Sequence, residues 1–331
     1  MRALPVKWGL SLPNRGALFG LTGVEEMIQT ARMAEESGVF DSIWVGDSLI
    51  HKPRLESIAM LSAIATHTKT ARLGTICMAS FPVRHPVLLA IQWATLDQLC
   101  QGRSLLGVCI GGGHEAELRA FGIKKEERVG RMREGIELLR QIWSEGEFSH
   151  RGKYYTLENY NIMPKPVQKP PPIWIAVSPD REQVGDKIVD QAMRRVGLLA
   201  DGYITMGVSA EEMRKRWRVI DATARQIGKD LSRFEVAIHG MVNIHDDRQK
   251  AYGQAKEYFN HYYGPSYPPE SLIKVWLAHG PPADCAGLIQ QWIDMGITTP
   301  VLRFTARDQT GQVRRFIEEV LPLLRLDRRL E

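Results

Sequence analysis

The sequence has only four cysteines among its 331 residues, and none of them stands at a metal-ligand spacing. Cys77, Cys100, Cys109 and Cys285 form no CxxC pair and no Cys/His ligand pattern. Two of them lie in apolar strand-like runs, where cysteine behaves as a small buried hydrophobe. Unpaired cysteines are typical of a reducing compartment. The sequence therefore favours a cytoplasmic protein, and it predicts neither a disulfide framework nor a metal site.

Long apolar runs and blocks of like charge are also missing. No run approaches the roughly 18 apolar residues of a membrane-spanning helix, and the N-terminal segment MRALPVKWGLSLP has too short an apolar region for a signal peptide. The net charge is +5, but Lys and Arg are dispersed among acids, and no nucleic-acid motif accompanies them. We therefore expect solvated basic faces and no nucleic-acid or membrane partner. A basic mouth for an anionic ligand is the alternative.

Strand-like and helix-like segments alternate along the chain. The expected strands are short apolar runs at 6–10, 42–45, 72–78, 104–110, 172–177, 201–205, 234–244 and 299–304. The expected helices have apolar residues every three or four positions, at 24–37, 55–68, 86–100, 127–143, 185–199, 211–227, 248–262, 283–295 and 313–324. Strands separated by helices run parallel. Eight of them predict an α/β fold, a (β/α)8 TIM barrel, as one domain over residues 1–331.

Two segments interrupt the alternation. Residues 147–171 contain strand-forming residues around a turn and then a proline-rich stretch, which predicts a hairpin insertion with an extended tether. Residues 263–282 are rich in proline and aromatic residues and predict an excursion from the barrel. Its aromatic side chains suit a lid over the barrel mouth or a subunit interface.

The stretch SLLGVCIGGGHEAELRAFG, residues 104–122, ends a strand in three glycines. A dinucleotide fingerprint would open a helix directly after the first strand, whereas these glycines follow the fourth strand and the next expected helix begins at Glu127. In a barrel, residues that follow a strand line the mouth where active sites lie. Glycines there let a flat ligand approach the backbone. A tight turn without a ligand is the alternative.

Four stretches resemble the luciferase-like monooxygenase family. They are SIWVGDSL, RLGTICMASFPVRHPVLLAIQWATLDQLCQGRSLLGVCIGGG, FGIKKEERVGRMREGIELLRQIW and YYTLENYNIMPKPVQKPPPIWIA. The second stretch is the most distinctive, with matching positions Arg84, His85, Pro86, Ala90, Thr95, Leu96, Asp97, Gly102, Arg103, Leu106 and Gly107. The resemblance covers nearly the whole chain, and the combination of stretches is specific. We interpret Arg84 and His85 as fixing their loop, and Asp97 with Arg103 as a structural ion pair at the opposite end of the barrel.

The resemblance implies a homodimer with the ring of FMN or coenzyme F-420 lying across the barrel mouth. The cofactor-binding candidates lie at or just after strand ends and are Ile76, Cys77, Met78, Ile110, Gly111, Gly112, Ala176, Val177, Ser178 and Arg303. A non-proline cis peptide is implied among the first three, which we interpret as an apolar backing for the ring. We do not expect Cys77 to be a redox thiol, because no second cysteine stands beside it in sequence. Arg303 suits a phosphate, and a salt bridge is its alternative.

Three residues are candidates for catalysis. Asp47 follows the second strand and suits either a ligand contact or a helix-capping role. Many relatives have His at the next position, where this chain has Ser48, so the proton donor is open, and His51 is a possible substitute. His114 follows the glycines and suits either the substrate or a solvated loop.

The sequence favours an FMN-dependent monooxygenase that acts on a small organic substrate and receives reduced flavin from a partner reductase. A coenzyme F-420-dependent dehydrogenase or reductase is the first alternative, and a flavin-binding barrel without turnover is the second. A barrel isomerase, aldolase or metal hydrolase is disfavoured, because the strand ends show no clear lysine, carboxylate pair or His-x-His pattern.

Overall fold

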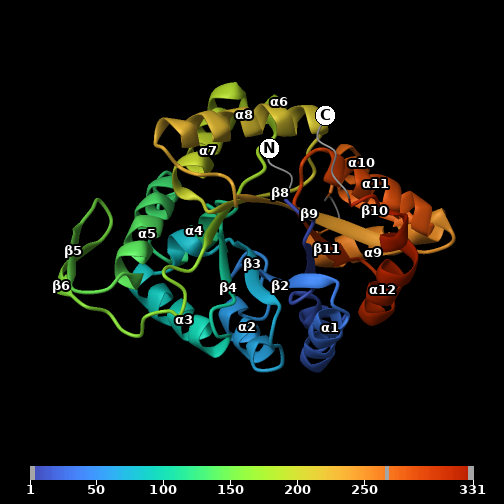
Figure 1. Cartoon of the computed structure of the whole chain (residues 1–331), viewed down its shortest axis with the longest axis horizontal. Coiled ribbons are helices and arrows are strands. Elements are labelled where there is room, and N and C mark those ends of the chain that lie inside the picture. Colours follow the sequence, from blue (N-terminus) through green and yellow to red (C-terminus); the bar gives the residue numbers. More distant parts are fainter. Residues whose placement is uncertain (1–3, 265–267, 327–331) are drawn as a thin grey trace.

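The structure is a computed structural model that describes residues 4–264 and 268–326. Eight parallel strands close into a barrel, in which β8 pairs with β9 and β11 pairs with β1 (Figure 1). They are β1 (Trp8–Leu12), β2 (Phe40–Asp47), β3 (Arg72–Met78), β4 (Ser104–Val108), β7 (Ile173–Ala176), β8 (Gly202–Thr205), β9 (Glu235–Ile244) and β11 (Thr299–Phe304). The predicted TIM barrel is confirmed.

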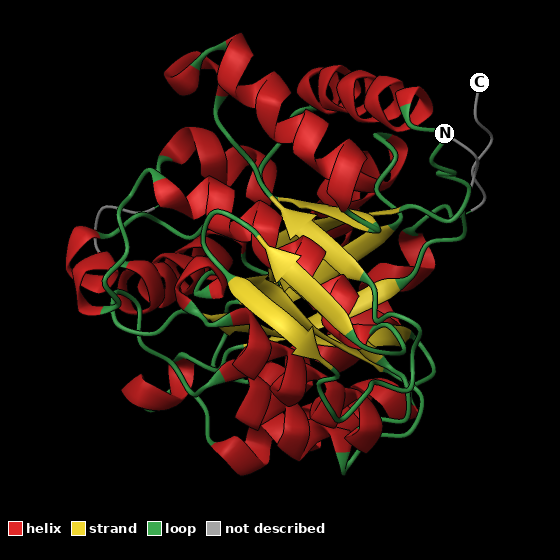
Figure 2. Cartoon of the chain, turned by 90° about the vertical axis from the view of Figure 1, so that its left-hand side faces the viewer, coloured by secondary structure: helices red, strands yellow, loops and turns green. Residues whose placement is uncertain are grey.

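Helices surround the strands, as the two perpendicular views show (Figures 1 and 2). The longer helices are α1 (Val24–Glu36), α2 (Ser57–Ala65), α3 (Pro86–Leu99), α5 (Glu127–Trp143), α7 (Asp186–Leu199), α8 (Ala210–Gln226), α9 (Arg248–Tyr263) and α11 (Pro282–Asp294). The short helices are α4 (Glu115–Ala120), α6 (Arg181–Val184), α10 (Glu270–Trp276) and α12 (Gln309–Arg315). Because helices cover the outside of the barrel and side chains fill its inside, the strands are nearly continuous apolar runs.

Side chains fill the interior of the barrel, so it is a packed core and not a pore. The interior cluster consists of Trp44, Ile76, Leu105, Trp174, Ile204, Ala237 and Val301. Trp44 needs glycine beside it, because a Cβ at Gly74 would lie 2.7 Å from its ring and a Cβ at Gly9 would lie 2.8 Å from its Nε1. This cluster forms the apolar floor below the carboxyl ends of the strands.

The two interruptions have structures of their own. Residues 147–171 contain the antiparallel hairpin of β5 (Phe148–Arg151) and β6 (Thr156–Tyr160), which projects beyond the ring of helices in Figure 1. Within 263–282 the described residues form α10 and β10 (Leu277–Gly280), which pairs with the second half of β9. Tyr262 and Trp276 are almost fully buried in a cluster with Phe259, and the lid or interface role of this segment stays a prediction. Tyr267 lies outside the described residues.

The expected last helix at 313–324 is broken. Helix α12 starts earlier, a π-helical turn follows at Phe316–Val320, and a 3-10 turn follows at Leu321–Leu323. Two further 3-10 turns occupy Gly16–Phe19 and Phe81–Val83. Among the described residues, no helix combines the length and apolar character that crossing a membrane requires.

The expected ion pair between Asp97 and Arg103 is wrong. The Asp97 carboxylate accepts hydrogen bonds from Ser104 Oγ at 2.6 Å and from the backbone N–H of Gln168 at 2.9 Å. The Arg103 guanidinium instead donates to the carbonyls of Ala71 and Thr68, at 2.5 and 2.8 Å. Both side chains satisfy backbone groups where α3 leads into β4, and buried backbone groups need such partners.

Candidate functional site

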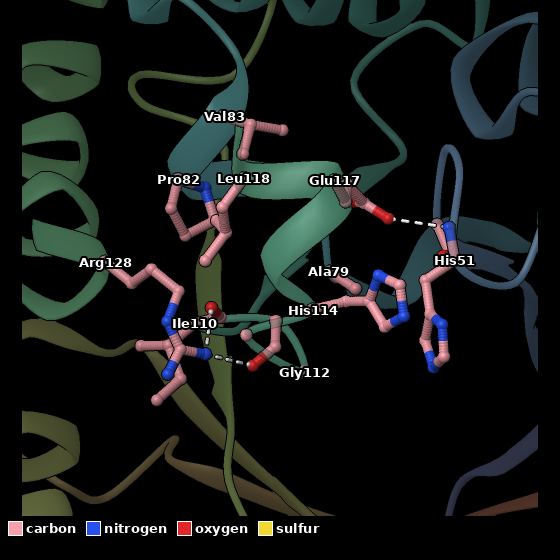
Figure 3. Close-up of a pocket in the computed structure, with 13 residues that line it drawn as sticks. His51, Ala79, Pro82, Val83, Ile110, Gly112, His114, Glu117, Leu118 and Arg128 are labelled. Atoms are coloured by element: carbon pink, nitrogen blue, oxygen red, sulfur yellow. Dashed lines mark hydrogen bonds between the residues drawn. The ribbon is translucent and has the colours of Figure 1, made fainter. Parts of the chain in front are cut away.

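The glycines of residues 111–113 border a hollow at the carboxyl ends of β2, β3 and β4 (Figure 3). It is small, with a cavity volume of about 40 Å³, and it is lined by Ser48, His51, Ala79, Pro82, Val83, Ile110, Gly111, Gly112, Gly113, His114, Glu117, Leu118 and Arg128. Five of the predicted site residues therefore meet there, namely Ser48, Ile110, Gly111, Gly112 and His114. This is the mouth face of the barrel, where barrel enzymes hold their active sites.

Two neighbouring glycines serve different purposes. Gly111 has a φ of +69°, and a Cβ built on it would lie 2.5 Å from the carbonyl oxygen of Ala79. Its backbone therefore requires glycine for the turn itself. Gly112 has ordinary φ, and a Cβ there would meet nothing within 4 Å. The tight-turn interpretation thus fits Gly111, whereas the space beside Gly112 is open to a ligand.

Arg128 was not expected at the site. Its guanidinium reaches from α5 and donates to the carbonyl oxygens of Gly111 at 2.8 Å and Ile110 at 3.3 Å. Burial lowers the pKa of this guanidinium. The sequence places Arg128 at the start of an amphipathic helix, where a basic residue ordinarily faces water, so only the fold reveals its position beside the glycines.

The buried Asp47 carboxylate holds three elements together. It accepts hydrogen bonds from Ser57 Oγ at 2.8 Å, from Ser80 N and Oγ at 2.8 and 2.5 Å, and from Arg84 at 3.0 Å. Arg84 also binds Glu56, which caps α2 through the N–H of Ala59. These contacts match the structural alternative for Asp47, and they confirm that Arg84 fixes its loop. The catalytic role of Asp47 stays a prediction.

Two histidines from different loops stack at the edge of the hollow. The rings of His51 and His114 have centroids 4.0 Å apart and an interplanar angle of 20° (Figure 3). Burial, then His114 and then Lys52, lower the pKa of His51. The Glu117 carboxylate accepts a hydrogen bond from the backbone N–H of His51 at 2.8 Å and so holds the loop after β2 against α4. Ser48 Oγ accepts the N–H of Lys52 at 3.2 Å.

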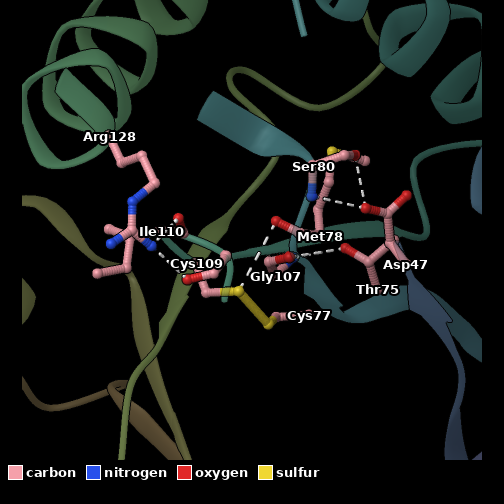
Figure 4. Close-up of a disulfide and its surroundings, with 10 residues drawn as sticks. Asp47, Thr75, Cys77, Met78, Ser80, Gly107, Cys109, Ile110 and Arg128 are labelled. Atoms are coloured by element: carbon pink, nitrogen blue, oxygen red, sulfur yellow. Dashed lines mark hydrogen bonds between the residues drawn. A yellow bond between two sulfur atoms is a disulfide. The ribbon is translucent and has the colours of Figure 1, made fainter. Parts of the chain in front are cut away.

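Cys77 and Cys109 form a disulfide between the ends of β3 and β4 (Figure 4). Their Cα atoms lie 6.1 Å apart, although 32 residues separate them in the chain. The sequence predicted no disulfide, and this expectation is wrong, because the partner of Cys77 is adjacent in space and not in sequence. The sequence favoured a reducing compartment because all four cysteines were expected to be free. Two of them are paired, so the cysteines no longer support that compartment. The implied cis peptide is confirmed between Ile76 and Cys77.

The predicted phosphate-binding residues lie elsewhere on the mouth. Ala176, Val177 and Ser178 are partly exposed at the end of β7. Ser178 Oγ donates to the carbonyl of Met206 at 2.6 Å and accepts from Arg216 at 3.2 Å. A hollow of about 950 Å³ borders Ser178 and runs between residues 178–186, 206–216 and 269–275. This hollow offers room for a long polar tail next to the end of β7.

Arg303, the predicted phosphate partner, is almost fully buried, so its guanidinium is not exposed at the mouth. It donates to Ser11 O at 2.8 Å, to Ser11 Oγ at 2.6 Å and to Tyr258 OH at 3.3 Å. It also lies 5.1 Å from the ring centroid of Tyr262, and Arg54 lies 5.8 Å from the same centroid. Two guanidinium groups, those of Arg303 and Arg54, therefore lie beside the Tyr262 ring at the end of β11. The contacts of Arg303 are with hydroxyl and carbonyl oxygens and an aromatic ring, so they do not form the salt bridge that was the alternative.

His239 is a site residue that sequence reasoning missed. It lies on the same face of β9 as Ala237, which packs in the barrel interior, because side chains two apart in a strand share a face. Its Nε2 is buried and has no hydrogen-bond partner among the described residues. Burial, then Arg303 and then Arg54, hold the pKa of His239 well below its usual range, so the ring is neutral at pH 7.

A flat flavin-type ring fits the residues of the mouth. Ile76 and Ala176 pack with the apolar floor, and Gly112 leaves open space at the edge. The Nε2 atom of His239 lacks a partner, as expected of a group that binds the polar edge of a ligand. Among the residues that the structure describes, no cluster of His, Cys, Asp and Glu could hold a metal ion.

Solved structures share this fold. An F420-dependent secondary alcohol dehydrogenase in complex with an F420-acetone adduct aligns with a TM-score of 0.80 at 19% identity, over 97% of this chain and 100% of that one. A monooxygenase from Streptomyces bottropensis aligns with a TM-score of 0.78 at 22% identity, over 96% of this chain and 99% of that one. The fold is thus that of a barrel class that contains oxidoreductases.

The family model of the luciferase-like monooxygenases matches residues 6–299, so the chain belongs to this family. Among its relatives is an F420-dependent glucose-6-phosphate dehydrogenase of Kineococcus radiotolerans, 27% identical over 89% of this chain and 91% of the relative. The protein of the same name from Amycolatopsis mediterranei is 26% identical over 92% of this chain and 95% of the relative. The chain is a flavin- or deazaflavin-dependent oxidoreductase.

Proposed function

We propose that this protein is a coenzyme F-420-dependent dehydrogenase or reductase that acts on a small organic substrate with a hydroxyl or carbonyl group. The stacked pair of His51 and His114 beside the open space at Gly112 is the observation that carries the proposal. It places two imidazole rings, which can accept a proton, where hydride transfer requires an acceptor. The names of the sequence relatives favour coenzyme F-420 over the FMN that the sequence first favoured.

The residues of the chain have separate tasks in this proposal. Coenzyme F-420 supplies the hydride chemistry when bound. Ile76 and Ala176 support the ring from the apolar floor, and Gly112 lets its edge approach the backbone. His239 Nε2 would hold the polar edge of the ring, and the charges of Arg54 and Arg303 near His239 would favour an anionic reduced form of the cofactor. His51 or His114 takes the hydroxyl proton of the substrate.

Replacing His51 or His114 by asparagine is expected to lower kcat by about 100-fold, because a positioned base is lost. In the wild type with His51 as the base, the rate of substrate oxidation should fall in acid only at a pH below the ordinary histidine range, because the base is active only when neutral and burial lowers the pKa of His51. The pH profile of kcat/KM measures this. His67→Asn, an exposed histidine bound to the Ala63 carbonyl, is the control and should change nothing.

A turnover assay tests the proposed function. The protein is mixed with oxidised coenzyme F-420 and a panel of secondary alcohols and sugar phosphates without oxygen, and the loss of cofactor absorbance is followed. The proposal expects substrate-dependent reduction that oxygen does not affect. Oxygen uptake with reduced FMN and an oxygenated product would instead establish the monooxygenase. Cofactor binding without turnover of any substrate would favour the non-catalytic barrel. The homodimer stays a prediction that light scattering tests.

A further inference from the structure

We propose that Cys77 and Cys109 form a redox-active disulfide that accepts two electrons from the reduced cofactor and passes them to a low-molecular-weight disulfide. The barrel would then have a second activity, thiol–disulfide oxidoreduction, at the same mouth. This inference rests on the proposed function, because it needs a reduced flavin-type cofactor beside the two sulfur atoms.

The position of the disulfide carries the first step of the argument. Cys77 directly follows Ile76, which belongs to the apolar floor of the mouth. Cys109 directly precedes Ile110 and Gly111, which line the glycine hollow. The disulfide therefore joins the residue that follows the floor residue Ile76 to the residue that precedes the glycine hollow, and Figure 4 shows it next to Ile110. A ring in this place has the sulfur atoms beside it.

The second step is the contrast among the four cysteines. Cys77 and Cys109 are both partly exposed. Cys100 and Cys285 are fully buried free thiols, and burial raises the pKa of both, to about 12 for Cys285. Thiol reactivity requires access and an ionised sulfur. Of the four cysteines, only the pair at the mouth therefore has the access that exchange with a solute requires.

The third step is the charge beside the pair. The Arg128 guanidinium donates to the carbonyl oxygens of Ile110 and Gly111, the two residues that follow Cys109. A cation near a dithiol favours its thiolate form, which is the form that attacks another disulfide. Figure 4 shows Arg128 on the same side of the disulfide as Cys109. The reduced pair would thus be ready to exchange.

The electron balance is complete. The S–S bond breaks as one sulfur accepts a hydride equivalent, two electrons and one proton, from the reduced cofactor. The other sulfur leaves as a thiolate and takes the second proton that the cofactor loses on oxidation. One reduced cofactor and one disulfide thus give one oxidised cofactor and two thiols. A thiolate of the reduced pair then attacks a low-molecular-weight disulfide, and the second thiol resolves the mixed disulfide, which releases two small thiols.

The test counts thiols. Wild-type protein is mixed without oxygen with one equivalent of reduced coenzyme F-420, quenched in acid, alkylated with a maleimide and mapped by mass spectrometry. We expect two new alkylated thiols, at Cys77 and Cys109, for each cofactor oxidised. Cys77→Ser and Cys109→Ser should abolish this oxidation, and the matched control Cys100→Ala should preserve it. With an excess of the small disulfide 5,5′-dithiobis(2-nitrobenzoate), the wild type should go on oxidising added reduced cofactor.

The outcomes separate the two proposals. If coenzyme F-420 binds but the thiol count stays constant, the disulfide is only a structural crosslink and the inference fails while the proposed function stands. If neither coenzyme F-420 nor FMN binds, the proposed function fails and the inference fails with it. Four free thiols in the protein as purified in air would overturn the inference alone. Because the decisive count uses the wild type, it does not depend on whether the serine variants fold.

Discussion

Replacing Asp47 by alanine is expected to lower the free energy of unfolding by about 3–5 kcal/mol, the cost of removing one partner from a buried ion pair. The carboxylate is almost fully buried and binds Ser57, Ser80 and Arg84. Without it, the Ser80 N–H loses its acceptor, and Arg84 keeps Ser80 Oγ and, as its carboxylate partner, the more exposed Glu56. Denaturation by urea, followed by far-ultraviolet circular dichroism, measures the change.

Glu56→Gln is the matched control for this variant. Glu56 binds the same guanidinium, but its side chain is 40% exposed, whereas that of Asp47 is 2% exposed. Exposed ion pairs contribute less than about 1 kcal/mol, so this change should have a small effect. If Asp47→Ala cost no more than Glu56→Gln, the carboxylate would not hold the ends of β2, α2 and the loop after β3 together. A catalytic role for Asp47 would then regain support.

Replacing Gly111 by alanine is expected to destabilise the protein by about 3 kcal/mol. An L-residue in the left-handed region costs about 1–2 kcal/mol, and the new Cβ would press on the backbone carbonyl of Ala79, which adds about 1–3 kcal/mol. The geometry at Gly111, φ +69° and 2.5 Å to that oxygen, imposes both costs. Urea denaturation measures this change as well.

Gly112→Ala separates the turn from the ligand site. A Cβ at Gly112 meets nothing within 4 Å, and its φ is ordinary, so stability should change by less than about 0.5 kcal/mol. Cofactor affinity should nevertheless fall by about tenfold, because the methyl group enters the space of the ring edge, and tenfold corresponds to about 1.4 kcal/mol. Unchanged cofactor affinity in Gly112→Ala would show that the cofactor ring does not lie beside Gly112.

The barrel could be predicted because its elements leave local signals. Strands covered on both sides are short apolar runs, and most helices have a clear period of three to four residues. β10 has only four residues and pairs with the second half of β9, so no local pattern marks it. Helix α4 has only six residues and follows the glycines after His114. Elements of this length depend on tertiary contacts that a sequence pattern does not contain.

The candidate site was predictable at the strand ends and not elsewhere. Cys77 and Cys109 stand near the ends of two strands that are neighbours in a (β/α)8 barrel. Their pairing follows from the order of the strands, and the distance between the two residues in sequence hides it. The stacking of His51 on His114 depends on the path of two loops. His239 lies in the middle of a long strand, where nothing in the sequence distinguishes a ligand-binding histidine from a core one.

A fluorescence titration of the purified protein with oxidised coenzyme F-420, and separately with FMN, tests the central claim most directly. We expect saturable binding of coenzyme F-420 with a Kd near 10 μM, about −7 kcal/mol, and weaker binding of FMN. Tighter binding of FMN would support a flavin site at the barrel mouth but would make FMN, and not coenzyme F-420, its cofactor. If neither bound with a Kd below about 100 μM, roughly −5.5 kcal/mol, the barrel mouth would not be a flavin-type site and the account would be contradicted.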